Sequence, residues 1–231
     1  MLFAREQALF ENRYDAGKQL AAQLGQYEGQ PVIVLAVPNG GVPVGLEIAL
    51  ALHADLDLVI VRKIPLPLNP EAGFGAVADD GTVILNDEVV EMVGLSPHQI
   101  NYQINQVRIK IRQRTLLYRK DRPLTVVNGK TVMITDDGLA SGFTMMAAVE
   151  SVRRRQPKEI VAAVPVASAG ALERVEKVAD RVVTLAKSTM PRFAVADFYR
   201  YWYDLTDDEV IQCLKEWRIR HFRSNTESPP E

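Results

Sequence analysis

The sequence predicts an α/β protein in which helices cover both faces of an open, mainly parallel sheet of about five strands. Short apolar runs of strand length alternate with segments of helical periodicity. The first run, residues 32–37, is apolar at every position, as is typical of a parallel strand that is buried on both faces. The 231 residues, 47% of them hydrophobic and 24% charged, suffice for one large globular domain.

Composition excludes several classes of protein. The 27 basic and 29 acidic residues give a net charge of −2, which does not suit a protein that coats nucleic acid or a membrane. The single cysteine, Cys213, cannot form an internal disulfide, so we expect a reducing, cytoplasmic location. The sequence offers no zinc-ligand spacing, signal-peptide layout or apolar run of the ~18 residues that a membrane span needs.

The first half of the chain predicts a strand–helix–strand unit followed by a break in the rhythm. A helix over 4–24 precedes the strand at 32–37, and an apolar helix over 43–52 leads to a second strand at 56–61. Residues 64–86 are rich in proline and glycine, so we expect a long flexible loop there. Within it, one hairpin is expected to pair 75–78 with 82–85.

The second half continues the alternation of helices and strands. We expect helices over 97–120, 145–154, 169–178 and 206–217, and strands over 132–135, 160–166 and 182–185. Thr206 and Glu209 have the spacing of a capping box at the start of the last helix. Residues 1–223 are expected to form one domain with a core at about 28–188, a hood of 189–205 with 1–25, and a disordered tail at 224–231.

The segment 132–144 carries the most specific chemical signal. A buried strand ends at two adjacent carboxylates, Asp136 and Asp137, at the sheet edge where open α/β sheets bind ligands. A turn of small residues follows, and the helix start beyond it offers backbone N–H groups and a favourable dipole to an anion. Ser141 and Thr144 add hydroxyl donors. A phosphate seat beside two acids that suit vicinal hydroxyls indicates a ribose 5-phosphate ligand.

This segment closely resembles the phosphoribosyl pyrophosphate (PRPP) signature of type I phosphoribosyltransferases. The signature is an apolar strand, two acids, three variable residues, Thr or Ser, Gly, any residue and Thr. The resemblance implies that Asp136 and Asp137 are catalytic, hold the ribose hydroxyls and bind Mg²⁺, directly or through water. It also implies that the 5′-phosphate is bound by Gly138, Leu139, Ala140, Ser141, Gly142, Phe143 and Thr144.

A second part of the resemblance follows the first strand, where the family binds pyrophosphate, often through a cis peptide. Asn39, Gly40 and Gly41 occupy this place, and the family more often has a basic residue at the position of Asn39. Both glycines are expected to offer backbone N–H groups. Arg62 and Lys63, at the end of the second strand, are expected to add cations. The loop at 64–86 matches the family's flexible catalytic loop, whose closure would exclude water.

The resemblance implies a Mg²⁺-dependent enzyme that moves 5-phosphoribosyl from PRPP to a nitrogenous acceptor and releases pyrophosphate. Enzymes of this type that act on 6-oxopurines carry an Asp at the position of Ala140, so we expect a base other than hypoxanthine or guanine. With Arg62-Lys63 and the aromatic region at 197–199, the sequence looks most similar to a prokaryotic branch of predicted phosphoribosyltransferases, for which the family supplies no acceptor.

Two other functions remain open at this stage. A regulatory protein would keep the pocket to sense PRPP or a nucleotide, or to bind RNA, without turnover; the basic helix face at 104–120 and Asn39 favour it, whereas the net charge opposes it. A hydrolase would use water as the nucleophile. Expected partners are PRPP, an acceptor and a second copy of the chain, with no membrane and no nucleic acid. The basic face is expected to be solvated or to contact another subunit.

Overall fold

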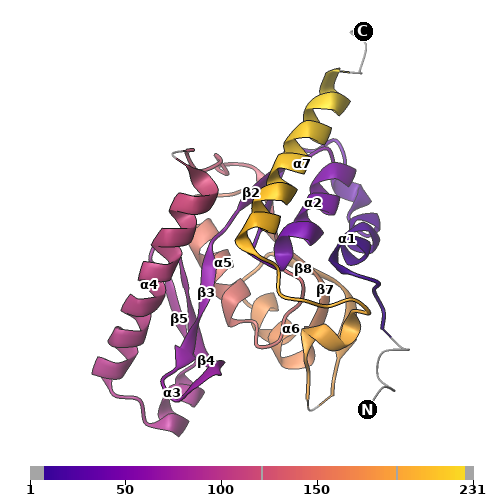
Figure 1. The fold of residues 1–231 in the computed structure, drawn as a ribbon. Coiled ribbons are helices and arrows are strands. Elements are labelled where there is room, and N and C mark those ends of the chain that lie inside the picture. Colours follow the sequence, from indigo (N-terminus) through magenta and orange to yellow (C-terminus); the bar gives the residue numbers. More distant parts are fainter. Residues whose placement is uncertain (1–7, 121, 191, 227–231) are drawn as a thin grey trace.

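A parallel sheet of five strands forms the centre of the structure, a computed structural model that describes residues 8–120, 122–190 and 192–226 (Figure 1). In sheet order, the strands are β2 (Asp55–Leu58), β1 (Val32–Ala36), β6 (Thr131–Thr135), β7 (Glu159–Ser168) and β8 (Arg181–Ser188). All four neighbouring pairs are parallel. The predicted fold class is therefore confirmed, and β7 and β8 extend beyond their predicted bounds.

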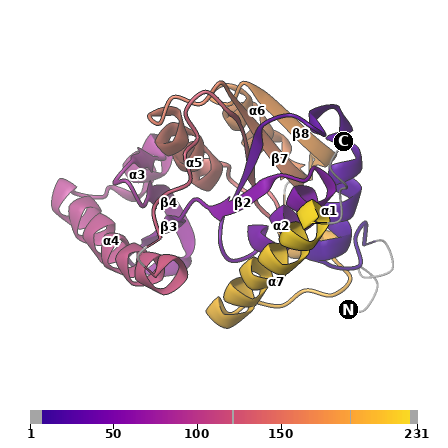
Figure 2. The same cartoon turned by 90° about the horizontal axis from the view of Figure 1, so that it is seen from above.

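Helices cover both faces of this sheet (Figure 2). One face carries α1 (Arg13–Ala22), α2 (Gly41–Ala51) and α7 (Asp207–Thr226), and the other carries α5 (Phe143–Arg153) and α6 (Ala169–Glu176). Successive residues of β1 point to opposite faces, so Val34 packs in the first layer and Leu35 in the second. This two-sided burial explains why the strand is apolar at every position.

A separate antiparallel sheet packs at the side of the central one. It consists of β3 (Val61–Leu66), β4 (Asn69–Ala78) and β5 (Val83–Leu85), and is followed by α3 (Asp87–Val93) and α4 (Pro97–Arg119). The hairpin predicted across 79–81 is confirmed, since Gly75 pairs with Leu85 and Val77 with Val83.

The expectation of a long loop over 64–86 is wrong for most of its length, and α3 was not predicted. Pro65 lies in β3, an edge strand whose pairing with β4 shifts register on both sides of this proline. A proline is tolerated in such a place because no ladder hydrogen bond is needed there. The second predicted strand also divides, because β2 ends at Leu58 and β3 begins at Val61.

Several predicted ends differ from the structure. Helix α1 begins at Arg13, and residues 1–7 of the predicted helix lie outside the described residues. Helix α7 runs to Thr226, so the expected disorder is wrong for 224–226, while 227–231 lie outside the described part. The Thr206–Glu209 capping box is confirmed by bonds of 2.8 Å from Thr206 N to Glu209 Oε2 and 3.3 Å from Glu209 N to Thr206 Oγ1. The structure adds two short 3₁₀ helices, η2 (Gly25–Tyr27) and η3 (Val195–Phe198).

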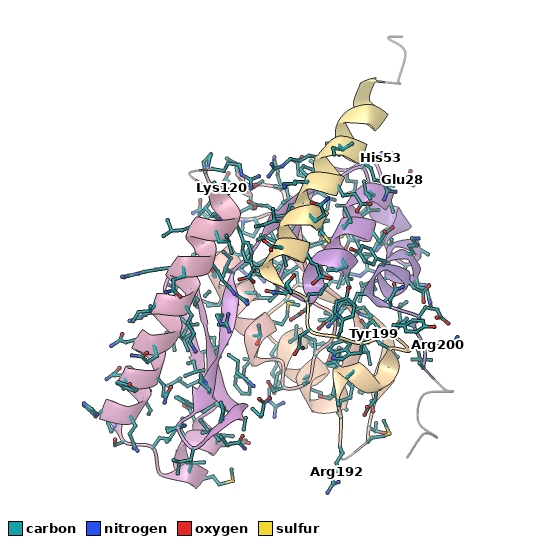
Figure 3. All side chains as sticks on the ribbon, viewed as in Figure 1. Glu28, His53, Lys120, Arg192, Tyr199 and Arg200 are labelled. Carbon is teal, nitrogen blue, oxygen red and sulfur yellow. The ribbon has the colours of Figure 1, made fainter. Side chains whose placement is uncertain are left out.

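The segment before α1 pairs with the segment around η3, beside the carboxyl edge of the sheet. Phe10 N donates to Phe198 O at 3.0 Å, and Arg200 N donates to Phe10 O at 2.8 Å. Tyr199 is buried, whereas its neighbour Arg200 lies at the surface (Figure 3). Within the described ranges, no helix has both the length and the apolar character of a membrane span.

The contact between α1 and α2 depends on a glycine. A Cβ at Gly17 would lie 2.9 Å from the Val44 carbonyl oxygen and 3.0 Å from Val44 Cα. We predict that Gly17→Ala lowers the thermal midpoint, because overpacking costs about 1–3 kcal/mol and exceeds the roughly 1 kcal/mol that alanine gains inside a helix. Gly25→Ala is the control, since a Cβ there meets nothing within 4 Å. Equal midpoints for the two variants would contradict this account.

Candidate functional site

The acidic pair lies where the central strand β6 ends, in contact with the loop that follows β1. A Cβ on Gly40 would lie 1.9 Å from Asp137 Oδ2, and one on Gly41 would lie 2.6 Å from the Thr135 carbonyl oxygen. Only residues without a Cβ allow the two loops to come this close. The structure therefore brings Asn39, Gly40 and Gly41 together with Asp136 and Asp137, as the sequence predicted.

The loop after β1 offers fewer backbone donors than expected. Gly41 N donates to the Val37 carbonyl oxygen at 3.0 Å, so this N–H is used within the fold. The expectation that both glycines present free N–H groups is wrong for Gly41, because it stands in the first turn of α2. Gly40 N has no acceptor among the described residues. The peptide bond between Pro38 and Asn39 is cis.

Asp137 is held by α1 and by the segment that precedes α7. Arg13 Nε donates to Asp137 Oδ2 at 2.8 Å, and Arg13 Nη1 donates to the Tyr203 carbonyl oxygen at 2.9 Å. The guanidinium lies 3.8 Å from the centre of the Trp202 ring. Tyr199 Oη donates to the Asp137 carbonyl oxygen at 2.6 Å. Side chain and backbone of Asp137 are thus both fixed by contacts distant in sequence.

Sequence reasoning missed Arg13. In the sequence it is one of several polar residues of an expected helix, and nothing local distinguishes it from Asp15 or Lys18. Its role follows from α1 and the 198–205 segment meeting at Asp137. Tyr199, from the aromatic region at 197–199, is buried against Phe10 with ring centres 5.3 Å apart.

The pKa values of both carboxyls are raised in the folded protein. Burial, reinforced by the negative charge of Asp137, raises the pKa of Asp136 well above its usual range. Burial also raises the pKa of Asp137, and the Arg13 guanidinium opposes this shift. One cation therefore compensates two buried carboxyls only in part. Such a pair favours a ligand that donates hydrogen bonds or brings positive charge.

The turn after the acidic pair has the features of an anion seat. Its middle is fixed to β7, since Leu139 N donates to the Val166 carbonyl oxygen at 2.9 Å and Ser168 N donates to the Leu139 carbonyl oxygen at 2.9 Å. Gly142, with φ of 84°, turns the chain into α5. Among the described residues, the backbone N–H groups of Ala140, Ser141 and Gly142 have no protein acceptor. These groups and the start of α5 are free to bind an anion.

The predicted phosphate-loop residues differ in what they expose. Ala140 and Ser141 are exposed, whereas the Leu139 side chain is buried and leaves only its backbone near the loop surface. A Cβ on Gly138 would lie 2.7 Å from Val195 Cγ1, so this position has no room for a side chain. Phe143 and Thr144 occupy the first turn of α5 and are half-buried.

Arg62 and Lys63 do not act together, because they lie on β3 and adjacent strand residues point in opposite directions. Arg62 is half-buried near Arg114, Tyr118 and Asp207; burial and the neighbouring Arg114 lower the pKa of its guanidinium. Lys63 is exposed, and its Nζ donates to the Glu71 carbonyl oxygen. The structure therefore places Arg62, but not Lys63, beside the elements that surround Asn39.

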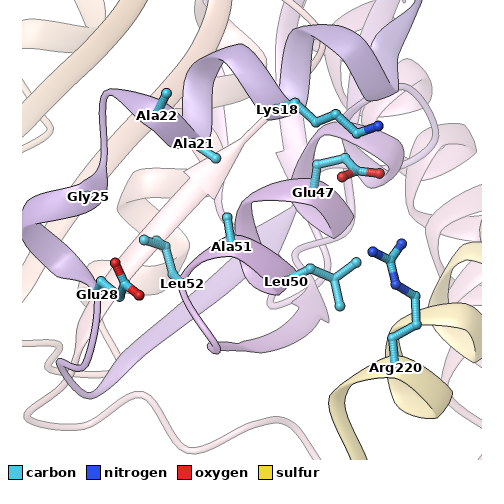
Figure 4. A pocket seen from close by; sticks show the side chains of 10 residues that line it. All are labelled: Lys18, Ala21, Ala22, Gly25, Glu28, Glu47, Leu50, Ala51, Leu52 and Arg220. Carbon is cyan, nitrogen blue, oxygen red and sulfur yellow. The ribbon is translucent and has the colours of Figure 1, made fainter. Parts of the chain in front are cut away.

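A cavity of about 390 Å³ adjoins the phosphate loop at Ala140. Its lining includes the hydroxyl-bearing side chains of Ser168, Ser188 and Thr189 and the ring of Phe193. A larger cavity of about 510 Å³ lies elsewhere, between the carboxyl ends of α1 and α2 and helix α7 (Figure 4). None of the predicted site residues lines the larger cavity, so its size does not make it the candidate site.

Comparisons with known proteins show the family of this chain. A family model described as the phosphoribosyl transferase domain matches residues 7–197. Proteins from two strains of Mycobacterium tuberculosis, both named "Putative phosphoribosyl transferase", are 39% identical over 206 residues, which is 89% of this chain and 46% of each relative. The chain thus spans about half the length of these relatives.

The crystal structure of the protein TT1426 from Thermus thermophilus has the same fold. It matches with a TM-score of 0.72 at 36% identity, over 90% of this chain and 98% of that one. A family match over most of the chain and a relative of this similarity point to one family. The chain belongs to the phosphoribosyl transferase domain family.

Proposed function

We propose that this protein transfers 5-phosphoribosyl from PRPP to a nitrogenous acceptor and releases pyrophosphate. The observation that carries the proposal is the order of three groups along the sheet edge. The free N–H groups of 140–142 lie on one side of Asp136 and Asp137, and the loop of Asn39–Gly41 lies on the other. This order suits a 5′-phosphate, a ribose diol and a diphosphate on one molecule.

In this reaction, the bond from C1 of the ribose to the diphosphate oxygen breaks and a bond from C1 to the acceptor nitrogen forms. The transition state is cation-like, so catalysis would come mainly from positioning and electrostatics. The loop 138–144 would hold the 5′-phosphate, and the two aspartates would accept hydrogen bonds from the hydroxyls. Asn39, Gly40, Gly41 and Arg62 would face the diphosphate. Lys63, the other cation that the sequence predicted, lies on the opposite side of β3 and has no part in this proposal.

The donor set fits Mg²⁺. Two adjacent, buried carboxyls with one cationic partner carry excess negative charge, which a divalent cation with oxygen ligands would stabilise. Magnesium commonly completes its coordination with oxygens of the substrate and of water. This agrees with the finding that no group of three or more metal-binding side chains occurs in the described part of the chain. Asp136 and Asp137 would hold the ion, directly or through water, and bound Mg²⁺ would neutralise charge on the diphosphate.

The cavity beside Ala140 is the best candidate for the acceptor site. Its lining of hydroxyls, small residues and the Phe193 ring suits a flat, hydrogen-bonding base. Ala140 has no carboxylate to act on a 6-oxopurine, which supports an acceptor other than hypoxanthine or guanine. We further propose a homodimer, as the family resemblance implies, and a cytoplasmic location, as the single cysteine indicates.

We predict that Asp136→Asn with Asp137→Asn weakens PRPP binding by about 100-fold or more. Each charge-assisted hydrogen bond contributes about 1.5–3 kcal/mol, and the double variant removes both charges. Calorimetric titration with PRPP and Mg²⁺ measures the loss, and Asp80→Asn, an exposed aspartate outside the site, is the control. Unchanged affinity in the double variant would end the assignment.

A pyrophosphate-release assay across candidate bases tests turnover itself. We expect release with at least one base other than hypoxanthine or guanine. Tight PRPP binding with no release for any base would favour the sensing protein. Release without any base would favour the hydrolase.

We predict that Arg13→Gln shifts the pH dependence of PRPP binding upward. Arg13 opposes the rise in the pKa of Asp137, so its loss raises that pKa further and reduces the ionised fraction at a given pH. Affinity should fall near neutral pH, recover as the pH rises, and be partly restored by Arg13→Lys. Titrations from about pH 6 to about pH 9 check this, with Arg200→Gln as the control. A uniform loss at every pH would show that Arg13 acts only on folding.

A further inference from the structure

One carboxylate oxygen near the candidate site accepts bonds from three donors. Asp207 Oδ1 lies 3.2 Å from Asn39 Nδ2, 2.5 Å from Tyr118 Oη and 3.2 Å from Arg114 Nη2. Asn39 belongs to the loop after β1, and Arg114 and Tyr118 lie one helical turn apart on α4. We call these three donors the oxyanion seat.

Contacts other than those with Asp207 also order the three donors of the seat. Tyr118 is 3% exposed, and its hydroxyl also lies 3.2 Å from Asn39 Oδ1, so its single proton lies between this oxygen and Asp207. Asn39 Nδ2 donates in addition to the Leu205 carbonyl oxygen at 2.7 Å. Arg62, half-buried nearby, adds a second guanidinium to that of Arg114. The seat therefore concentrates positive charge and hydrogen-bond donors on one point.

Asp207 takes no part in the capping box of the helix that carries it. The first turn of α7 is capped by Thr206 and Glu209, whose side chains bond each other's backbone N–H groups. The Asp207 carboxylate makes no bond of this kind and points to the seat instead. Its side chain is 36% exposed, so it has a path into solvent. The Asp207 carboxylate is thus an anion of the protein itself that occupies the oxyanion seat.

We propose that the oxyanion seat of Asn39, Arg114 and Tyr118 binds an anionic oxygen of the substrate's diphosphate, and that Asp207 occupies the seat when no diphosphate is present. The inference rests on the proposed function and extends it to two residues of α4 and one of α7. The proposal gives Asn39 a role in binding diphosphate, although the family more often has a basic residue at this position. The Asn39 amide lies beside Tyr118 of α4 and shares Asp207 with Tyr118 and Arg114. Diphosphate and Asp207 compete for the same donors, so Asp207 lowers the affinity of the site for its ligand.

The experiment titrates inorganic pyrophosphate with Mg²⁺ into the intact chain. Asp207→Ala should bind this probe about tenfold more tightly than wild type, and Asp207→Asn should also gain affinity. Asp208→Ala is the matched control, an exposed aspartate in the same helical turn, and should bind as wild type does. In the Asp207→Ala background, Arg114→Gln and Tyr118→Phe should each lose about tenfold in affinity. Circular dichroism confirms that each variant is folded.

Each other result overturns the inference. It fails when neither Asp207 variant gains affinity, when Asp208→Ala gains as much, or when Arg114→Gln and Tyr118→Phe bind the probe as their parent does. A parallel titration with PRPP separates this failure from that of the proposed function. If wild type binds PRPP and the Asp136→Asn, Asp137→Asn variant does not, the proposed function stands while the seat is rejected. If no folded variant binds PRPP or pyrophosphate, both are rejected.

Discussion

The contact between the loops after β1 and β6 is the constraint on which the candidate site depends. The two strands are neighbours in the sheet, so their loops leave the carboxyl edge side by side. Glycines at 40 and 41 let the first loop reach the backbone at Thr135 and the carboxylate of Asp137. Any larger residue would separate the groups proposed to bind diphosphate from those proposed to bind ribose. Two adjacent strands thus supply the candidate site. Other parts of the molecule position its residues and partly compensate the charge of its carboxyls.

Elements far apart in sequence supply that support. Arg13, from the first helix, holds the side chain of Asp137, and Tyr199, from the segment before the last helix, holds its backbone. Helix α4 supports the other loop through Tyr118 and Asn39. The guanidinium of Arg119, at the end of the same helix, is buried and pairs with Asp57 at 3.1 Å. Arg119 is therefore turned inward, whereas Arg108, Lys110 and Arg112 are exposed, in line with the expected solvated or intersubunit face.

The sequence predicted the central sheet well because its evidence is local. Apolar runs such as 32–37 and the carboxylates that follow Thr135 can be identified without any tertiary contact. Most of β3 and the first part of β4 were missed, because Pro65 and neighbouring glycines obscure the alternation of an edge strand. The pairing of Lys63 with Arg62 failed for a related reason, since alternate strand residues face opposite ways. Arg13, Tyr118 and Asp207 could not be predicted, because each acquires its partner only when distant elements meet.

The packing of α7 begins after its first turn. This limits which contacts would change if diphosphate displaced Asp207 from the oxyanion seat. Val210, Cys213 and Leu214 are the first residues of the helix to enter the main apolar cluster, and Asp207 precedes all three. The preceding stretch contains Tyr201, Tyr203 and Asp204, all exposed. This stretch also contacts Arg13 through Trp202 and the Tyr203 carbonyl oxygen. A carboxylate leaving its donors would thus shift the first turn of α7 and this stretch, and not the residues from Val210 onward. Asp207 could therefore leave or enter the oxyanion seat without unpacking Val210, Cys213 and Leu214 from the apolar core.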